Sequence, residues 1–222
     1  MKKLEFLGSS CIYPKLAPQP IKEEYLLTGP LEGTNQAYAV AKIAGIRMAQ
    51  AYQEQYGFGA ISLMPTNLYG PDDNFDLQSS HVIPALVRKF HEAKISRSAE
   101  IVIWGSGEPR REFLHVDDLA GAAVYFMLEY DQPEIVNIGS GTDLTIRELA
   151  ELIAGIVGFS GRLVFDASKP DGTPRKLLDV SRAKAAGWQS RIPLDEGIHQ
   201  TYRWFIESVA GEERRHIHST SR

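Results

Sequence analysis

Short apolar runs alternate with longer amphipathic stretches along most of this chain. Residues 4–7 and 60–64 are apolar runs that predict strands, and the stretch 35–56 between them has the period of a helix that ends at Gly57. A long helix between two short apolar strands is typical of a βαβ unit, in which the strands lie parallel in one sheet. The sequence therefore predicts an α/β fold.

The alternation continues through the second half. Further strands are predicted at 101–104, 135–138 and 162–165, and further helices at 81–94, from 116 onward, at 145–157, 181–187 and 194–208. Residues 15–34 are rich in proline and glycine and predict a long ordered loop, which in a compact domain is usually functional. Residues 166–176 predict a polar loop. Residues 211–222 are polar, and we expect disorder there rather than metal binding by His216 and His218.

Composition and charge narrow the class of protein. Hydrophobic residues make up 43% of the chain and charged residues 23%, as in ordinary globular proteins. The net charge of −4, without a large basic cluster, argues against a nucleic-acid surface. No apolar run approaches the roughly 20 residues that span a bilayer, and the N-terminus lacks the apolar segment of a signal peptide. A single cysteine excludes an intramolecular disulfide and suits a reducing compartment, so we expect a cytoplasmic protein. Taken together, these features predict no metal, nucleic-acid or membrane partner.

The strongest chemical signal is the pair Tyr38 and Lys42. Residues four apart lie on one face of a helix, one turn apart, and a neighbouring ammonium favours the phenolate form of a tyrosine, which suits it to proton transfer. For such a pair alone, the simpler interpretation is a tyrosine packed under the helix and a lysine in solvent. Ser9 and Ser10, directly after the first predicted strand, lie where α/β proteins place ligand contacts.

Together these residues form a serine-tyrosine-lysine set. Ser9 or Ser10 can hold a carbonyl oxygen by a hydrogen bond, Tyr38 can protonate that oxygen, and Lys42 can tune the tyrosine and hold a ribose. Such a set is suited to hydride transfer from a nicotinamide cofactor to a ketone.

Several segments in addition to this set resemble one family. They are LGSSCIYP at 7–14, MPTNLYGP at 64–71, SHVIP at 80–84, WGSG at 104–107, REFLHVDD at 111–118 and DASKPDG at 166–172. With these segments the chain, from about residue 3 to residue 205, resembles the extended short-chain dehydrogenase/reductases and, within them, the GDP-L-fucose synthase family. Each segment alone is a weak signal, whereas the combination is specific.

The resemblance implies part of a Rossmann-type, doubly wound parallel sheet in residues 1–75. It also implies a smaller α/β lobe for a nucleotide sugar in residues 76–210, from which the chain returns to the sheet. The implied activity is NADPH-dependent epimerisation at C3 and C5 and reduction of the 4-keto group of GDP-4-keto-6-deoxy-D-mannose. The implied partners are this GDP-sugar and a second copy of the chain, in a homodimer.

The resemblance also implies site residues. Ser9, Tyr38 and Lys42 would form the reductive triad, and Cys11 and His81 the acid/base pair for epimerisation. The implied contacts to NADPH are Leu7, Gly8, Ser9, Ser10, Lys42, Pro65, Thr66, Asn67, Leu68 and His81. The implied contacts to the GDP-sugar are Arg88, Trp104, Arg111 and Asp171.

Each of these residues also has a simpler interpretation. Cys11 in an apolar segment is typical of a buried small hydrophobe, and His81 at a helix start is typical of a residue beside a cap. For the implied sugar contacts, the simpler interpretation is a surface charge for Arg88 and Arg111. It is core packing for Trp104 and a turn residue for Asp171.

The sequence departs from the family at one point. No Gly-x-x-Gly-x-x-Gly loop follows an opening strand, and in the family this loop helps to bind the cofactor pyrophosphate. We therefore expect a truncated form or fragment whose activity depends on the absent part. Two alternatives stay open: another nucleotide-sugar 4-epimerase or dehydratase of the superfamily, against which Cys11 and His81 argue, and an inactive nucleotide-sugar-binding fragment.

Overall fold

The computed structural model describes residues 2–219, with side chains through residue 209. The chain divides into two compact units: unit 1 comprises Met1–Leu68, Pro109–Leu144 and Gly172–Arg191, and unit 2 comprises Tyr69–Glu108, Thr145–Asp171 and Ile192–Arg222. The sequence placed one boundary near residue 75 with a later return to the sheet. In the structure the chain first leaves unit 1 after Leu68, and it returns to that unit twice.

The elements follow the predicted alternation. The helices are α1 (Gln36–Tyr56), α2 (Val82–Ile95), α3 (Val116–Glu129), α4 (Ile146–Val157), α5 (Ser181–Ala185) and α6 (Leu194–Ser219), with 3-10 turns at Ser10–Ile12, Glu23–Tyr25 and Gly33–Asn35. The strands are β1 (Lys3–Leu7), β2 (Gly59–Pro65), β3 (Asn67–Tyr69), β4 (Glu100–Trp104), β5 (Arg110–Arg111), β6 (Phe113–His115), β7 (Val136–Ile138), β8 (Leu144–Thr145), β9 (Arg162–Asp166) and β10 (Arg175–Lys176). The strands that the sequence did not predict are β3, β5, β6, β8 and β10, and each has only two or three residues, too few to show a period.

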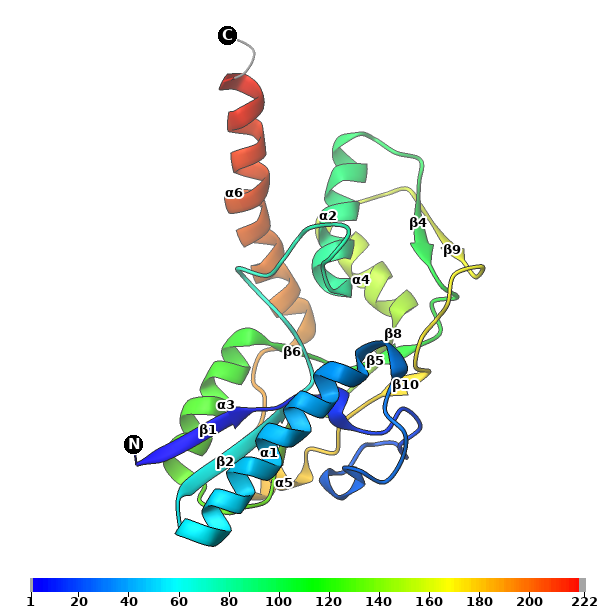
Figure 1. Ribbon diagram of the computed structural model, residues 1–222. Coiled ribbons are helices and arrows are strands. Elements are labelled where there is room, and N and C mark those ends of the chain that lie inside the picture. The colour runs from blue at the N-terminus through cyan, green and yellow to red at the C-terminus, as the bar shows by residue number, and fades with distance from the viewer. Residues whose placement is uncertain (1, 220–222) are drawn as a thin grey trace. The chain divides into compact units, whose positions relative to one another are not determined.

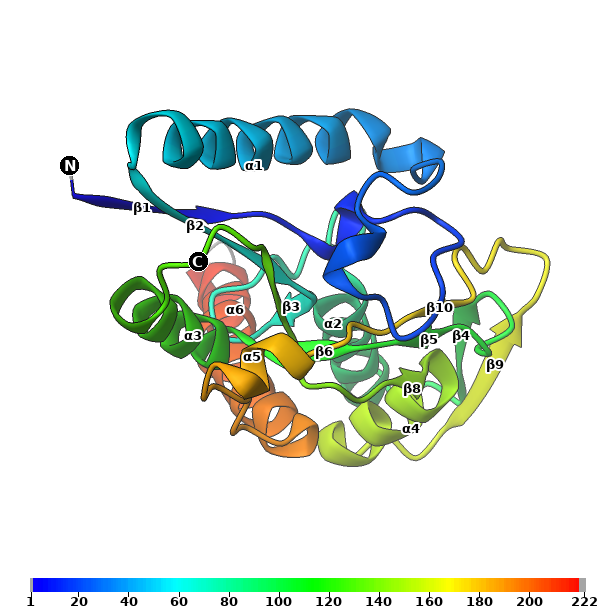
Figure 2. The same ribbon diagram turned by 90° about the horizontal axis from the view of Figure 1, so that it is seen from below.

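A parallel three-stranded sheet in the order β1-β2-β7 forms the centre of unit 1. Helix α1 covers one face of this sheet and α3 covers the other (Figure 2). Successive strand residues face opposite sides, so Met64 packs with Ile43 and Ile46 of α1, whereas Leu63 packs with Phe126 of α3. The predicted α/β fold with parallel strands is confirmed.

Strand β1 lies at one edge of the described sheet and is only partly buried along its length. The strand includes a carboxylate, Glu5, which would be unfavourable in a strand buried on both faces. Burial still raises the pKa of Glu5 above its ordinary value, although the charge of Lys3 acts in the opposite direction. The partial exposure of β1 explains why a carboxylate is tolerated there.

Unit 2 is built around helices α2 and α4 and the parallel pair β4 and β9 (Figure 1). In the capping box at the start of α4, Thr145 Oγ1 accepts from the Glu148 amide at 3.0 Å, and the Glu148 carboxylate accepts from the Thr145 amide at 2.7 Å. Helix α4 packs against both α2 and α6. The core of this unit is therefore helical, with the two strands to one side.

Helix α6 extends further than predicted. It continues to Ser219 and includes most of the segment 211–222, for which the sequence predicted disorder, while residues 220–222 lie outside the described residues. Glutamate and arginine at 212–215 are good helix formers, and extending an existing helix costs far less than nucleating one. Among the described residues, no helix is both long enough and apolar enough to cross a membrane.

Candidate active site

Helix α1 presents Tyr38 and Lys42 on one face, next to the end of β1. Its buried side includes Ala39 and Ile43, whereas the side chain of Tyr38 is 49% exposed. The Lys42 ammonium lies 5.7 Å from the centroid of the Tyr38 ring and donates to the Leu7 carbonyl at 2.8 Å. Tyr38 is therefore not a packing residue under the helix, and Lys42 is fixed across α1 and β1 rather than left in solvent.

The turn after β1 holds Ser9 and Cys11, and this turn contacts α1. The Gly8 amide donates to the Leu63 carbonyl at 2.8 Å, so the backbone stays close to β2 after β1 ends. A Cβ atom on Gly8 would clash with the Met64 side chain, so glycine lets the turn lie close to β2 without moving that methionine. Ser9 then caps the 3-10 turn, and its Oγ accepts from the Cys11 amide at 3.1 Å.

Cys11 is only partly buried, and its sulfur has a cationic partner. Lys176 Nζ lies 3.2 Å from Cys11 Sγ. Burial by itself would raise the pKa of the thiol. The charge of Lys176, together with hydrogen bonds from Ser9, Lys176 and Asn35, outweighs burial and holds the pKa of Cys11 below its ordinary value. The thiol thus differs from the buried, inert cysteine of the simpler interpretation.

The loop after β2 lies next to the turn after β1. Leu7 and Leu63 are register partners, so the two parallel strands end side by side. Thr66 and Asn67 in this loop both donate to the Glu112 carbonyl, at 3.3 and 2.8 Å. The predicted cofactor contacts at 7–10 and 65–68 therefore follow from the carboxyl ends of two adjacent parallel strands.

Glu112 is a buried carboxyl that the sequence did not identify. Its Oε1 accepts from the Gly141 amide at 2.7 Å and its Oε2 from the Leu178 amide at 2.9 Å, so it joins two segments distant in the chain. Burial raises the pKa of Glu112 to about 7, although these amides and Thr66 favour the charged form. No local pattern around Glu112 in the sequence could have predicted these partners, because both come from other segments.

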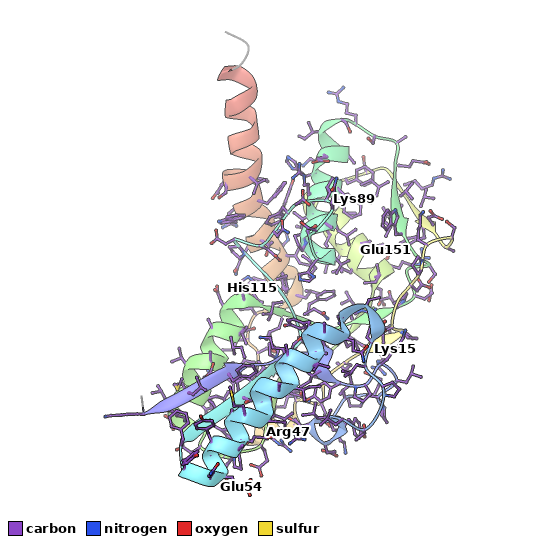
Figure 3. All side chains as sticks on the ribbon, in the orientation of Figure 1. Lys15, Arg47, Glu54, Lys89, His115 and Glu151 are labelled. Atoms are coloured by element: carbon purple, nitrogen blue, oxygen red, sulfur yellow. The ribbon has the colours of Figure 1, made fainter. Side chains whose placement is uncertain are left out.

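Two of the predicted site residues of unit 2 belong to α2: His81 precedes its first residue, and Arg88 lies within it. His81 is exposed at the N-cap of α2, where its side chain makes no capping hydrogen bond. The Arg88 guanidinium is paired with Glu92 at 2.7 Å. The neighbouring Lys89, labelled in Figure 3, donates instead to the Val102 carbonyl of β4 at 3.1 Å. The sequence prediction did not include Lys89.

Trp104 and Asp171 are close to the loop after β4. The Trp104 side chain is 71% exposed, which contradicts the core-packing interpretation, and Lys169 Nζ lies 5.6 Å from the centroid of its ring. The Asp171 carboxylate accepts from the Ser106 amide at 2.7 Å and from the Ser106 hydroxyl at 2.8 Å. Asp171 therefore organises this loop. Arg111, in unit 1, is half-buried and donates to the Arg110 carbonyl at 2.9 Å.

Comparison with known proteins identifies the family of the chain. The model of the NAD dependent epimerase/dehydratase family matches residues 1–139. The chain belongs to this family. Within the family, it is 62% identical to the probable GDP-L-fucose synthase 1 of Oryza sativa subsp. japonica over 96% of the chain and 65% of that relative. It is 58% identical to the GDP-L-fucose synthase of Escherichia coli over 94% of the chain and 68% of that protein.

Solved structures in the family give the same result. The GDP-L-fucose synthetase of Naegleria fowleri bound to NADP is 32% identical and covers 95% of the chain and 68% of that structure, with a TM-score of 0.88. The chain spans about two thirds of the length of these relatives. Family membership and fold follow from these matches.

Proposed function

We propose that this chain is a GDP-L-fucose synthase-type enzyme: it epimerises C3 and C5 of GDP-4-keto-6-deoxy-D-mannose and reduces its 4-keto group with NADPH. The observation that carries this proposal is the position of Cys11, whose sulfur is paired with Lys176 in the same turn as Ser9. A ketone reductase needs only the serine, tyrosine and lysine, whereas epimerisation beside the ketone also needs a base. The names of the relatives from rice and E. coli support the same reaction.

The reductive half of the reaction rests on unit 1. Ser9 and Tyr38 would hold the ketone oxygen, and Tyr38 would deliver a proton to it. The Lys42 ammonium, fixed by the Leu7 carbonyl, lies beside the Tyr38 ring and fits a ribose hydroxyl. When bound, NADPH would supply the hydride.

The residues present fit the part of a dinucleotide near its nicotinamide ring. A lysine ammonium, an exposed tyrosine hydroxyl and the adjoining backbone edges at 7–10 and 65–68 provide donors and acceptors in one place. In parallel α/β sheets, ligands bind outside the carboxyl ends of the strands, where both edges lie.

The epimerisation half needs a group that removes a proton from C3 or C5. Protons beside a ketone are acidic enough for a thiolate or an imidazole to exchange, and a ketone oxygen held by Ser9 and Tyr38 would stabilise the enolate. We assign Cys11 and His81 to this acid/base pair. The Cys11 thiol fits the role of base, because its pKa is held below the ordinary value.

We assign recognition of the GDP-sugar to Arg88, Trp104, Arg111 and Asp171. An exposed tryptophan offers a flat apolar surface to a base or sugar, and arginines can bind a diphosphate through paired hydrogen bonds. Because the Asp171 carboxylate accepts hydrogen bonds from Ser106, we also assign it a role in shaping the adjacent loop. We also propose a homodimer, on the family resemblance, and a cytoplasmic location, which a free thiol suits.

The test uses the 222-residue chain itself. The first step is an NADPH titration followed by cofactor fluorescence, for which we expect saturable binding. The second step incubates the chain with GDP-4-keto-6-deoxy-D-mannose in D₂O and follows deuterium at C3 and C5 by mass spectrometry, with and without NADPH. We expect exchange at both carbons and, with NADPH, conversion to GDP-L-fucose.

Two other outcomes would point to the alternatives. Cofactor binding with turnover of a nucleotide sugar at C4, but no exchange at C3 or C5, would favour another epimerase or dehydratase of the superfamily. A folded chain that binds GDP-sugar but neither binds NADPH nor exchanges protons would be an inactive binding protein. Either result would contradict the proposed reaction.

A further inference from the structure

The ammonium of Lys176 contacts the only sulfhydryl in this protein. Lys176 lies 165 positions after Cys11, and its Nζ is 3.2 Å from Cys11 Sγ. The family resemblance assigned no role to this lysine, which the sequence placed at the end of a polar loop. A cation at this distance stabilises a thiolate directly, since opposite charges within ~4–6 Å favour the charged form of an acid.

The other charged groups of the same pocket are already paired with one another or with neighbours. Lys15, labelled in Figure 3, forms an ion pair with Glu32 at 2.9 Å, and Arg175 forms one with Asp143. The carboxylate of Glu32 is thus compensated by Lys15. Of the charged side chains lining this pocket, Lys176 is the one that contacts the sulfur.

The backbone around Lys176 is fixed at two points. Strand β10 pairs with β5 in parallel, with Lys176 opposite Arg111. Two residues further on, the Leu178 amide donates to the buried Glu112 carboxylate at 2.9 Å. The ammonium therefore projects toward Cys11 from a held strand rather than from a free loop, so the backbone of Lys176 is in place before any substrate binds.

We propose that Lys176 is a positioning residue that holds the Cys11 sulfur as a thiolate and so prepares it to remove a proton from the carbon beside the substrate ketone. In that step the C–H bond breaks, its proton bonds to the sulfur to give the neutral thiol, and its electron pair enters the enolate. The catalytic consequence rests on the proposed function. The ionisation of Cys11 does not, and it can be measured without substrate or cofactor.

The experiment measures the rate of Cys11 alkylation by iodoacetamide as a function of pH in the folded chain. Because the chain has one cysteine, every modification reports on Cys11. The thiolate is the reactive form, so the midpoint of the profile gives the pKa of the thiol. For the unaltered chain we expect a midpoint below the value of about 8.5 for a free cysteine.

Three variants separate the contact from general effects. Lys176→Met keeps an unbranched side chain one atom shorter and removes its charge, and we expect the midpoint to rise by about one unit, which slows alkylation at neutral pH about tenfold. Lys176→Arg keeps the charge and should restore most of the shift. Lys22→Met removes an exposed lysine in the same unit that is paired with Glu24, and should leave the midpoint unchanged.

The result can overturn the proposal in several ways. A midpoint at or above that of a free cysteine in the unaltered chain would do so even if no variant folds. The proposal is also wrong if the midpoint is unchanged in folded Lys176→Met, or if Lys22→Met shifts it equally. A low midpoint that depends on Lys176, in a chain that shows no proton exchange, would uphold the assignment of Lys176 and contradict the proposed function instead.

Discussion

The two units hold their predicted functional residues in different ways. In unit 1, Lys42 is bound to the Leu7 carbonyl and the sulfur of Cys11 is paired with a lysine. In unit 2, the Trp104 side chain is 71% exposed. The two residues of unit 1 expected to act at the reacting ketone are therefore fixed by contacts within the chain, whereas this residue of unit 2, expected to bind the substrate, is largely open to solvent.

This difference follows from what each kind of residue must do. A group that transfers a proton has to be held within about 0.5 Å of its working geometry before the substrate arrives. A side chain that recognises a ligand gains most of its contacts only when the ligand covers it. The comparison therefore predicts that substitutions of Tyr38 and Glu112 in unit 1 change chemistry or stability, while substitutions of Trp104 and Asp171 in unit 2 change affinity or local order.

The largest effect is expected from Tyr38→Phe. This change removes the hydroxyl that protonates the ketone oxygen, so we expect reduction to slow by about a thousandfold, within the range for loss of a general acid. Deuterium exchange at C3 and C5 should remain detectable, because Cys11 and His81 are unchanged. NADPH oxidation and mass spectrometry measure the two activities separately.

The matched control for Tyr38 is Tyr52→Phe. Tyr52 is another tyrosine of α1 and is similarly exposed, at 52% against 49%. We expect both activities to be unchanged in this control. Equal loss of exchange and reduction in Tyr38→Phe would contradict the division of roles between the two sets of residues.

The next effect concerns Glu112 and the stability of unit 1. Because the pKa of Glu112 is raised from 4.5 to about 7 on folding, the folded state binds an extra proton between these values. This group therefore contributes stability that is fully present below pH 4.5 and is lost as pH rises through about 7. The full shift corresponds to about 3 kcal/mol in the free energy of unfolding.

Glu112→Gln tests this contribution. The amide can accept through one oxygen only, so one of the two backbone donors, Gly141 or Leu178, loses its partner and the variant is less stable. Its deficit relative to the unaltered chain should shrink as pH rises from 4.5 to about 7. Urea unfolding across this range measures the deficit. A deficit that grows with pH would show that folding lowers the pKa of Glu112 instead.

A smaller effect is expected from Trp104→Ala in unit 2. Loss of an aromatic surface for the nucleotide costs about 1–3 kcal/mol in stacking, so the affinity for GDP should fall about tenfold. The melting temperature should change little, because the side chain is mostly exposed. Val102→Ala, on the same exposed face of β4, is the control and should not change GDP binding. Calorimetry with GDP measures both; a loss of stability without a loss of affinity would return Trp104 to a packing role.

The smallest effect is expected from Asp171→Ala. This change removes the acceptor of the Ser106 amide, so hydrogen exchange at Ser106 should accelerate about fivefold, as for loss of one exposed hydrogen bond. Glu151→Ala, on the exposed side of α4 in the same unit, should leave that exchange rate unchanged (Figure 3). If Ser106 exchange does not change in Asp171→Ala, the carboxylate does not organise the loop.

Helix α1 shows how much of the site local sequence periodicity can predict. The spacing of Ala39, Ile43 and Ile46 fixes the buried side of the helix, and the four-residue interval then places Tyr38 and Lys42 together on one face. The sequence also predicted a serine at the end of β1 beside them, since parallel strands end at a common edge. These features depend on neighbours close in the chain, so periodicity was enough to find them.

The sequence by itself determined the α/β alternation, the family and the helix face that carries Tyr38 and Lys42, because each of these depends only on short-range spacing or on contiguous motifs. Only the tertiary structure decided what surrounds Cys11 and Glu112. The Lys176 ammonium comes to the Cys11 sulfur across 165 positions, and the Leu178 amide to the Glu112 carboxylate across 66. Charge and burial act through space, so the protonation of these two groups could not be predicted from the residues beside them in the chain.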